Sequence, residues 1–138
     1  MQIREIKLTE LYTAYEILKS QKKDMEYKEY EDLVYEMIKE NYKILSIIDK
    51  EKAITYAGIK IQTDLTYKRH LYVNELITDT KENSSYYNKE MLSYLIDYAR
   101  INQCKNIVIS IDNNNDLSKL AVENNFRNLN LSYFTKVI

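Results

Sequence analysis

The sequence is poor in the residues that form covalent cross-links, tight turns and metal sites. Its 138 residues include one cysteine, one glycine and one histidine, and there is no proline. A single cysteine excludes an internal disulfide and is typical of a reducing compartment. With one histidine and one cysteine an ordinary zinc site is also excluded, so we expect no metal.

Long apolar runs and an excess of one charge are missing as well. No apolar run approaches the ~18 residues of a membrane helix, and the N-terminal MQIREIKLTE lacks the apolar region of a signal peptide. The 20 basic and 21 acidic residues give a net charge of −1, and the Tyr27-Lys28 and Tyr67-Lys68 pairs form no basic stripe. We therefore expect a cytoplasmic protein that binds neither nucleic acid nor membrane.

What is present indicates one folded domain spanning residues 1–138. Charged residues make up 30% and hydrophobic residues 45% of the chain, which is typical of a folded protein rather than a disordered one. Hydrophobic periodicity predicts elements in the order βααβββαβαβ. The strands are expected at 2–7, 42–48, 53–63, 71–78, 107–109 and 129–137, and the helices at 9–22, 27–41, 86–104 and 117–126. This order fits an α/β (α+β) fold with a mixed, mostly antiparallel sheet and helices on both faces.

The central segment, residues 71–110, contains a strand, a polar loop, an amphipathic helix and a short β-branched strand. Strict alternation would place one set of the first strand's side chains (Leu71, Val73, Glu75, Ile77) on one face and the other set (Tyr72, Asn74, Leu76, Thr78) on the opposite face. The loop directs the first amides of the helix at the sheet edge, where a phosphate would bind.

This segment resembles a known family. LYVNELITD, a loop into a helix, ARINQC and a buried strand are similar to the cofactor-binding segment of the GNAT acetyltransferase superfamily, in particular its small bacterial members. IREI, two helices and YKILSIIDKEKAITYAGIKI precede it in the same order, so the resemblance covers nearly the whole chain. It implies a GNAT-like fold, acetyl-CoA as cofactor, and a cleft where the fourth and fifth strands separate, with the backbone of Ile77 and Thr78 offered to the pantetheine arm.

The phosphate loop departs from the family pattern. The family wraps the pyrophosphate with an Arg/Gln-x-x-Gly-x-Gly/Ala loop, because glycine permits close approach and positive φ. Here Asn83 stands at the Arg/Gln position, and Tyr86 and Asn88 replace the glycines. Asn88 can adopt a left-handed backbone, whereas the Tyr86 ring is expected in the pyrophosphate space. With Asn114, which matches a family asparagine, the candidate cofactor-binding residues are Ile77, Thr78, Asn83, Ser84, Ser85, Tyr86, Tyr87, Asn88, Lys89 and Asn114.

Catalysis would require a base for the amine and a proton for the leaving thiolate. Glu75 and His70 are the candidate bases. Glu75 is interpreted either as a catalytic or substrate-binding residue or as part of a surface or cross-strand ion pair. His70 is interpreted either as a base or as a half-exposed histidine at the start of a strand. The family's tyrosine acid is replaced by Ala121, and Tyr133 is a candidate substitute.

Two further residues have alternative interpretations. Gly58, in the middle of a strand, indicates either a β-bulge or close packing beside the substrate. Cys104 is expected in the core, because no histidine accompanies it as a nucleophile would require.

Three functions remain open at this point. The first is an N-acetyltransferase that moves an acetyl group from acetyl-CoA to a small amine or a protein amino group. The second is a GNAT-fold binding or regulatory module without catalysis, which loss of both loop glycines and the tyrosine would favour. The third is a variant that accepts a different acyl-CoA. By analogy with the family, a homodimer is possible.

Overall fold

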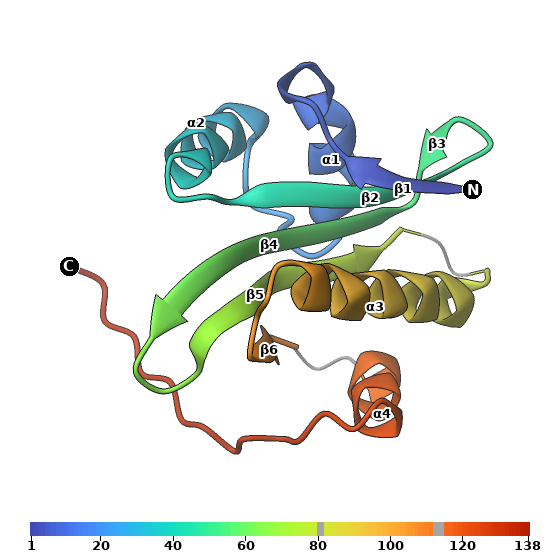
Figure 1. The fold of residues 1–138 in the computed structure, drawn as a ribbon. Helices are drawn as coiled ribbons and strands as arrows, with labels where there is room; N and C mark the ends of the chain where they lie inside the picture. Colours follow the sequence, from blue (N-terminus) through green and yellow to red (C-terminus); the bar gives the residue numbers. More distant parts are fainter. Residues whose placement is uncertain (80–81, 112–114) are drawn as a thin grey trace.

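The computed structural model describes residues 1–79, 82–111 and 115–138 (Figure 1). The element order follows the prediction up to the last helix. The strands are β1 (Gln2–Glu5), β2 (Lys43–Asp49), β3 (Lys52–Ala53), β4 (Thr55–Asp64), β5 (Lys68–Thr78) and β6 (Asn106–Ile109). The helices are a short 3-10 turn (Leu8–Glu10), α1 (Leu11–Leu18), α2 (Tyr27–Ile38), α3 (Ser84–Ile101) and α4 (Asn115–Glu123).

The sheet is mostly antiparallel, as predicted. Its order is β1-β2-β4-β5-β6, with β3 paired to β2, and among the described strands β5 and β6 alone run parallel. Helices α1 and α2 cover one face and α3 and α4 cover the other (Figure 1). The α+β class and the helices on both faces are therefore confirmed.

The two faces of the sheet have different cores. Beneath α1 and α2 the buried residues include four tyrosines, and the face beneath α3 and α4 is mainly aliphatic. The buried tyrosines of the first core are Tyr15, Tyr30, Tyr42 and Tyr56. Because a buried tyrosine hydroxyl needs a hydrogen-bond partner, this core contains polar contacts that an aliphatic core would lack.

A β-bulge in β5 overturns the predicted alternation. Across the β4–β5 ladder Gly58 pairs with Glu75 and Ile59 pairs with Val73, so Asn74 is the extra residue. Leu71 and Val73 pack on the α3 side, and so does Leu76, whereas Ile77 packs with the tyrosine-rich core. The single assigned face for Leu71, Val73, Glu75 and Ile77 is therefore wrong, because an inserted residue reverses the side-chain faces beyond it.

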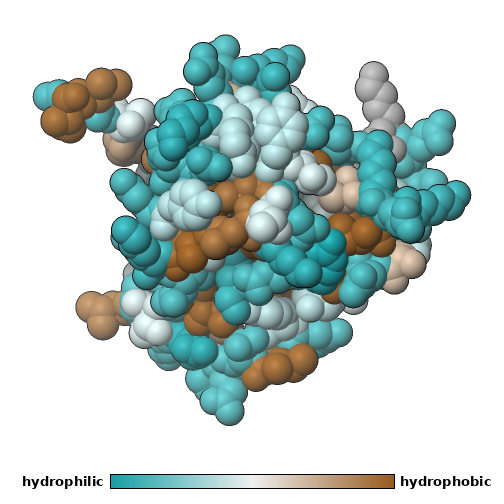
Figure 2. Space-filling view, turned by 90° about the horizontal axis from the view of Figure 1, so that it is seen from above, coloured by the Kyte–Doolittle hydropathy of each residue, from teal (hydrophilic) through white to brown (hydrophobic). Residues whose placement is uncertain are grey.

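The predicted last strand, 129–137, is also wrong. Residues 126–138 have no regular secondary structure, and no backbone hydrogen bond joins 127–138 to the described part of the chain. Asn125 and Asn130 have left-handed backbones, with φ of 68° and 51°, which interrupts an extended strand. Several apolar side chains of this segment stay exposed, and apolar groups protrude on the side of the molecule where Figure 1 places the C-terminus (Figure 2).

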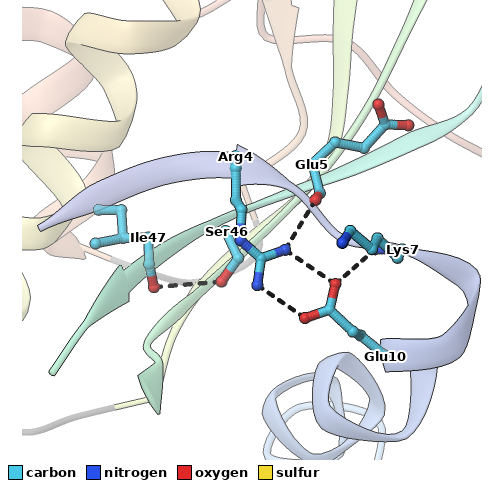
Figure 3. Close-up of polar contacts among 6 residues, drawn as sticks. All are labelled: Arg4, Glu5, Lys7, Glu10, Ser46 and Ile47. Carbon is cyan, nitrogen blue, oxygen red and sulfur yellow. Dashed lines mark hydrogen bonds and ion pairs between the residues drawn. The ribbon is translucent and has the colours of Figure 1, made fainter. Parts of the chain in front are cut away.

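A polar cluster ties β1 to the first helical turn (Figure 3). The Arg4 guanidinium donates to both carboxylate oxygens of Glu10, at 2.9 and 2.8 Å, and to the Glu5 carbonyl at 3.2 Å. The Lys7 amide also donates to Glu10, at 2.9 Å. These contacts close the turn that leads the chain from the sheet edge into α1.

In the described ranges no helix is long and apolar enough to cross a membrane.

Candidate functional site

A small hollow opens where β5 and β6 separate. The parallel ladder ends at Val73 and Ile109, with one further bond from the Ser110 amide to the Val73 carbonyl at 3.1 Å. Beyond that point the hollow, of about 40 Å³, is lined by Gln21, Lys22, Asn74, Glu75, Leu76, Ser110, Ile111 and Leu117. Past Val73 no described strand pairs with this edge of β5. The opening lies where the sequence predicted a cleft.

Glu75 borders this hollow and continues a chain of tyrosine hydroxyls. Tyr42 Oη donates to Glu75 Oε1 at 2.6 Å and lies 2.9 Å from Tyr56 Oη. Tyr56 Oη is in turn 3.1 Å from Tyr30 Oη. Tyr30 comes from α2, Tyr56 from β4 and Glu75 from β5, and Tyr42 directly precedes β2, so tertiary packing assembles this chain of hydroxyls.

The protonation of Glu75 is balanced by opposing effects. Burial of this half-buried carboxyl raises its pKa, while the Tyr42 hydrogen bond and the nearby Lys22 charge lower it, with a net rise. Burial also raises the pKa of Tyr42 and Tyr56 far above the ordinary range, and that of Tyr30 to about 12. The tyrosines therefore stay neutral, and Glu75 is the titrating member of the chain.

Gly58 makes room for this arrangement. A Cβ atom at position 58 would overlap Glu75 Oε1 and the Tyr42 hydroxyl. Gly58 has no positive φ, so the requirement is for space and not for backbone conformation. The β-bulge interpretation is supported, since the register shifts beside Gly58, and Gly58 is closely packed against Glu75 and Tyr42. Its place beside a substrate stays a prediction.

Asn74, the bulged residue, brings an unused acceptor to the same place. Its Oδ1 is buried, and the described residues offer it no hydrogen-bond partner. Buried acceptors are rarely left unpaired because the loss of hydration is costly. An N–H donor from a ligand in the hollow would satisfy it.

The beginning of α3 lies at the end of β5. Asn83 precedes the helix with a left-handed backbone (φ 59°), makes no side-chain capping bond, and no acidic residue lies in the first turn. The first amides of a helix have no partner within it, so this end can bind an anion. Lys89 is exposed five residues after the helix start.

The expectation for Asn88 needs correction. Positions 84–89 are helical, and the left-handed residue is Asn83 and not Asn88. The Asn88 side chain is buried and its Oδ1 accepts a hydrogen bond from Thr78 Oγ1. Asn88 therefore joins α3 to the end of β5 and does not form a glycine-like turn.

The two tyrosines in the first turn of α3, Tyr86 and Tyr87, contact the residue before β1 and the last residue of β2. The Tyr86 hydroxyl lies 3.9 Å from Met1 Sδ and its side chain is half exposed, while Tyr87 donates to Asp49 at 2.9 Å. The Tyr86 ring thus stands in the first turn of α3, beside the free amides. Its interference with a pyrophosphate stays a prediction.

His70 is not half-exposed as its alternative interpretation had it; it is fully buried. Its Nδ1 lies 2.8 Å from the Lys68 carbonyl and its Nε2 lies 3.1 Å from Gln62 Nε2. Both ring nitrogens therefore have a hydrogen-bond partner within the protein. His70 is also five residues from Glu75 along an extended strand, so the structure does not bring the two candidate bases together.

The remaining candidates lie apart or outside the described chain. Tyr133 is largely exposed in the C-terminal segment, near Tyr72. Asn114 falls outside the described residues. Ala121 is buried in α4, and Cys104 is partly buried, with burial raising its thiol pKa, which disfavours a nucleophile.

Sequence reasoning missed the three linked tyrosines, of which Tyr42 contacts Glu75, and the buried, unpaired acceptor of Asn74. The tyrosines lie in separate parts of the chain, and nothing in their spacing links them. A usable signal was the chain's single glycine in the middle of a strand, since glycine weakens a strand unless a close neighbour requires it.

Comparison with solved structures decides the fold. No protein-family model and no curated protein sequence matches this chain. A putative acetyltransferase from Agrobacterium tumefaciens superposes with a TM-score of 0.82 at 12% identity, over 99% of this chain and all of the other. The chain has a GNAT-like fold.

Two other solved structures show how widely this GNAT-like fold is used. An aminoglycoside 6'-N-acetyltransferase from Acinetobacter haemolyticus gives a TM-score of 0.78 at 14% identity, covering 100% and 99% of the two chains. A transcriptional regulator from Bacillus halodurans gives 0.79 at 14% identity, covering 99% of each. At such identities the likeness establishes the GNAT-like fold and leaves the acceptor open.

Proposed function

We propose that this protein transfers an acetyl group from acetyl-CoA to an amine, with Glu75 as the general base. The observation that carries the proposal is the placement of Glu75: a carboxyl with a raised pKa, bonded to Tyr42, at the hollow where β5 and β6 separate. Acetyltransferases among the solved structures share the fold. A base with a pKa moved toward neutrality is suited to accept a proton near pH 7.

The residues around the hollow fit the cofactor. The uncapped first turn of α3, with no acidic residue, suits the phosphates, and Lys89 adds positive charge. The unpaired edge of β5 at Ile77 and Thr78 offers backbone groups to the amides of a pantetheine arm, and Asn74 Oδ1 accepts a hydrogen bond. Acetyl-CoA would supply the thioester carbon that the amine attacks.

Glu75 would take the proton that the amine nitrogen loses as it bonds to the acyl carbon. The Tyr42 hydroxyl holds Oε1 in place, which leaves Oε2 to receive the proton. When the carbon–sulfur bond breaks, the thiolate leaves with the electron pair and is protonated by solvent. A small-molecule amine and a protein amino group both remain acceptors of the proposed reaction.

The test combines binding and turnover. Calorimetry with acetyl-CoA should show stoichiometric micromolar binding, and an amine screen with thiol detection should find an acceptor. Glu75→Gln should keep the fold and acetyl-CoA binding, because glutamine still accepts from Tyr42, while turnover falls by roughly 10²–10⁴-fold. Unchanged turnover in this variant would remove Glu75 from the mechanism.

A second candidate is a GNAT-fold binding module without catalysis. It is favoured by Tyr86 beside the helix amides, by Ala121 where the family has its acid, and by the regulator of the same fold. No acetyl-CoA binding up to millimolar cofactor would support it. A longer acyl-CoA that binds when acetyl-CoA does not would instead support the variant with a different acyl donor.

A further inference from the structure

A second hollow of the described chain is larger than the one beside Glu75. It has a volume of about 260 Å³ and lies on the α3 side of the sheet, at the C-terminal end of that helix. Its lining residues are Asn41, Lys43, Ile59, Lys60, Ile61, Arg69, Tyr98 and Asn102. Arg69 is the second residue of β5, whereas the first turn of α3 lies near the last residue of β5. This hollow and the proposed acetyl-CoA site therefore lie at opposite ends of the strand.

The hollow has an apolar floor. Ile59 belongs to the core beneath α3 and Ile61 packs against the same core, and the Tyr98 ring packs there too. An apolar floor of this kind binds the non-polar body of a small molecule.

Two cations stand over this floor. Lys43 is paired with Ile59 across the β2–β4 ladder, so both side chains lie on the same face. Arg69 precedes Leu71 by two residues in β5, which places it on that face as well. Among the described residues neither cation has an ion-pair partner, and the lining contains no acidic side chain.

Arg69 is held in position for a ligand. Its Nε donates to the Asn102 carbonyl at the end of α3, at 2.9 Å. This bond gives a partner to a carbonyl at the negative end of the helix dipole. The two terminal guanidinium nitrogens have no hydrogen-bond acceptor among the described residues. A guanidinium anchored in this way loses little freedom when it binds a phosphate or carboxylate.

Lys60 provides an internal contrast. Because Ile59 and Ile61 face α3, alternation along β4 directs the Lys60 side chain to the opposite face. Lys60 therefore borders the hollow with its backbone, and its charge lies on the other side of the sheet.

We propose that this hollow binds a small amphipathic anion, a phosphate ester or carboxylate joined to an apolar body. The anionic group lies between Lys43 and Arg69, and the apolar body lies on the partly exposed Ile61 and Tyr98 side chains, above the buried Ile59. The site is independent of acetyl transfer, and the proposal stands or falls without it.

The test is a titration of the whole protein with phenyl phosphate, followed by amide chemical shifts. Phenol and inorganic phosphate are the two half-ligand controls, at matched ionic strength. The expected result is saturable binding, tighter than either control, with shifts at the amides of Ile59, Ile61 and Asn102. Lys43→Gln and Arg69→Gln should each weaken binding by about fivefold, and Lys60→Gln, which removes the same charge on the other face, should leave it unchanged.

Three results would overturn the proposal. They are the absence of saturation by ~20 mM ligand, shifts confined to the first turn of α3, and equal weakening by the Lys60 and Lys43 substitutions. Because the Lys43 side chain lies on the opposite face of the sheet from the Glu75 carboxyl, acetyl-CoA binding by Lys43→Gln should equal that of the unaltered protein. A failure of this proposal is thereby distinguished from a failure of the acetyltransferase proposal.

Discussion

Gly58 lies directly opposite Glu75 across the β4–β5 ladder, and the carboxylate occupies the space that a side chain at position 58 would need. The same space holds the Tyr42 hydroxyl that donates to Glu75. The only glycine of the chain is thus explained by one pairing at the edge of the candidate site. The absence of a methyl group there permits a half-buried carboxyl to keep its donor.

Gly58→Ala should therefore disturb both stability and activity. Since the new methyl group displaces Glu75 or Tyr42, we expect a loss of about 1–3 kcal/mol in the free energy of unfolding and a large fall in turnover. Urea denaturation and the thiol-release assay measure the two effects. Ile59→Val, on the same strand, is the matched control and should lower stability by about 0.5–1.5 kcal/mol with turnover intact. A Gly58→Ala variant as stable as the parent would refute the packing argument.

Tyr42→Phe should change the pH dependence of turnover. The Tyr42 hydrogen bond lowers the pKa of Glu75, so its removal raises that pKa further. Because a general base acts when deprotonated, the acidic limb of the rate profile should move to higher pH. Measurement of kcat/KM from pH 5 to 9 would detect the shift, and an unmoved limb would show that Glu75 does not set it.

Glu10→Gln should lower the free energy of unfolding at neutral pH and lower it less in acid. The Arg4 guanidinium, with the Lys7 amide, lowers the pKa of Glu10 to about 2, below its unfolded value near 4.3. A lowered pKa stabilises the fold above the unfolded value and the stabilisation is lost as pH falls toward 2. At pH 7 we expect a loss of about 1 kcal/mol, given partial exposure, shrinking below pH 4.

The control for this pH effect is Asp32→Asn. Asp32 pairs with Lys28 at 3.1 Å on the exposed surface of α2, and such pairs contribute little. In urea unfolding at pH 7 and pH 3, the free energy of unfolding of this variant should differ little from that of the parent at either pH. An Asp32→Asn effect as large as that of Glu10→Gln would show that the Arg4–Glu10 geometry confers no special stability.

Tyr86→Gly should tighten acetyl-CoA binding. The substitution removes the ring from the first turn of α3 and restores a family glycine, so we expect the affinity to rise severalfold. Glycine in the helix costs about 1 kcal/mol of stability, which thermal unfolding would register. Tyr94→Gly, another partly exposed tyrosine of α3, should cost similar stability and leave affinity unchanged. Equal affinity in both variants would mean that Tyr86 does not obstruct the phosphates.

Local patterns explain why most of the architecture was predictable. The 3.6-residue repeat of α3 and the apolar runs of β2, β4 and β5 depend on neighbours in sequence, and their order matched the structure. The last strand failed because a strand needs a partner as well as a suitable composition. In residues 127–138 the described structure shows no backbone pairing with a strand, and Asn130 has a left-handed backbone.

The candidate site was predictable only in part. Glu75 was singled out on its strand, and a hollow opens between β5 and β6, the strands that the sequence predicted as the fourth and fifth. The roles of Glu75 and of this hollow stay predictions. The face on which Glu75 lies was not predictable, because the bulge at Asn74 shifts the register by one residue and strict alternation cannot anticipate it. The burial of His70 was missed for a related reason: its surroundings come from Gln62 and Tyr67, and their approach depends on the β4–β5 pairing.

The sequence by itself determined the elements, their order and the class of fold, since hydrophobic periodicity and chain topology are written along the chain. Only the tertiary structure decided which side chains meet. It joined Tyr30, Tyr42 and Tyr56 to Glu75 from four separate parts of the chain. It also placed Gly58 where only a glycine leaves room for Glu75, and set Lys43 and Arg69 on one face of the sheet. The physical reason is that contacts between residues far apart in sequence depend on strand register and packing. A single inserted residue moves the following side chains to the other face of the sheet.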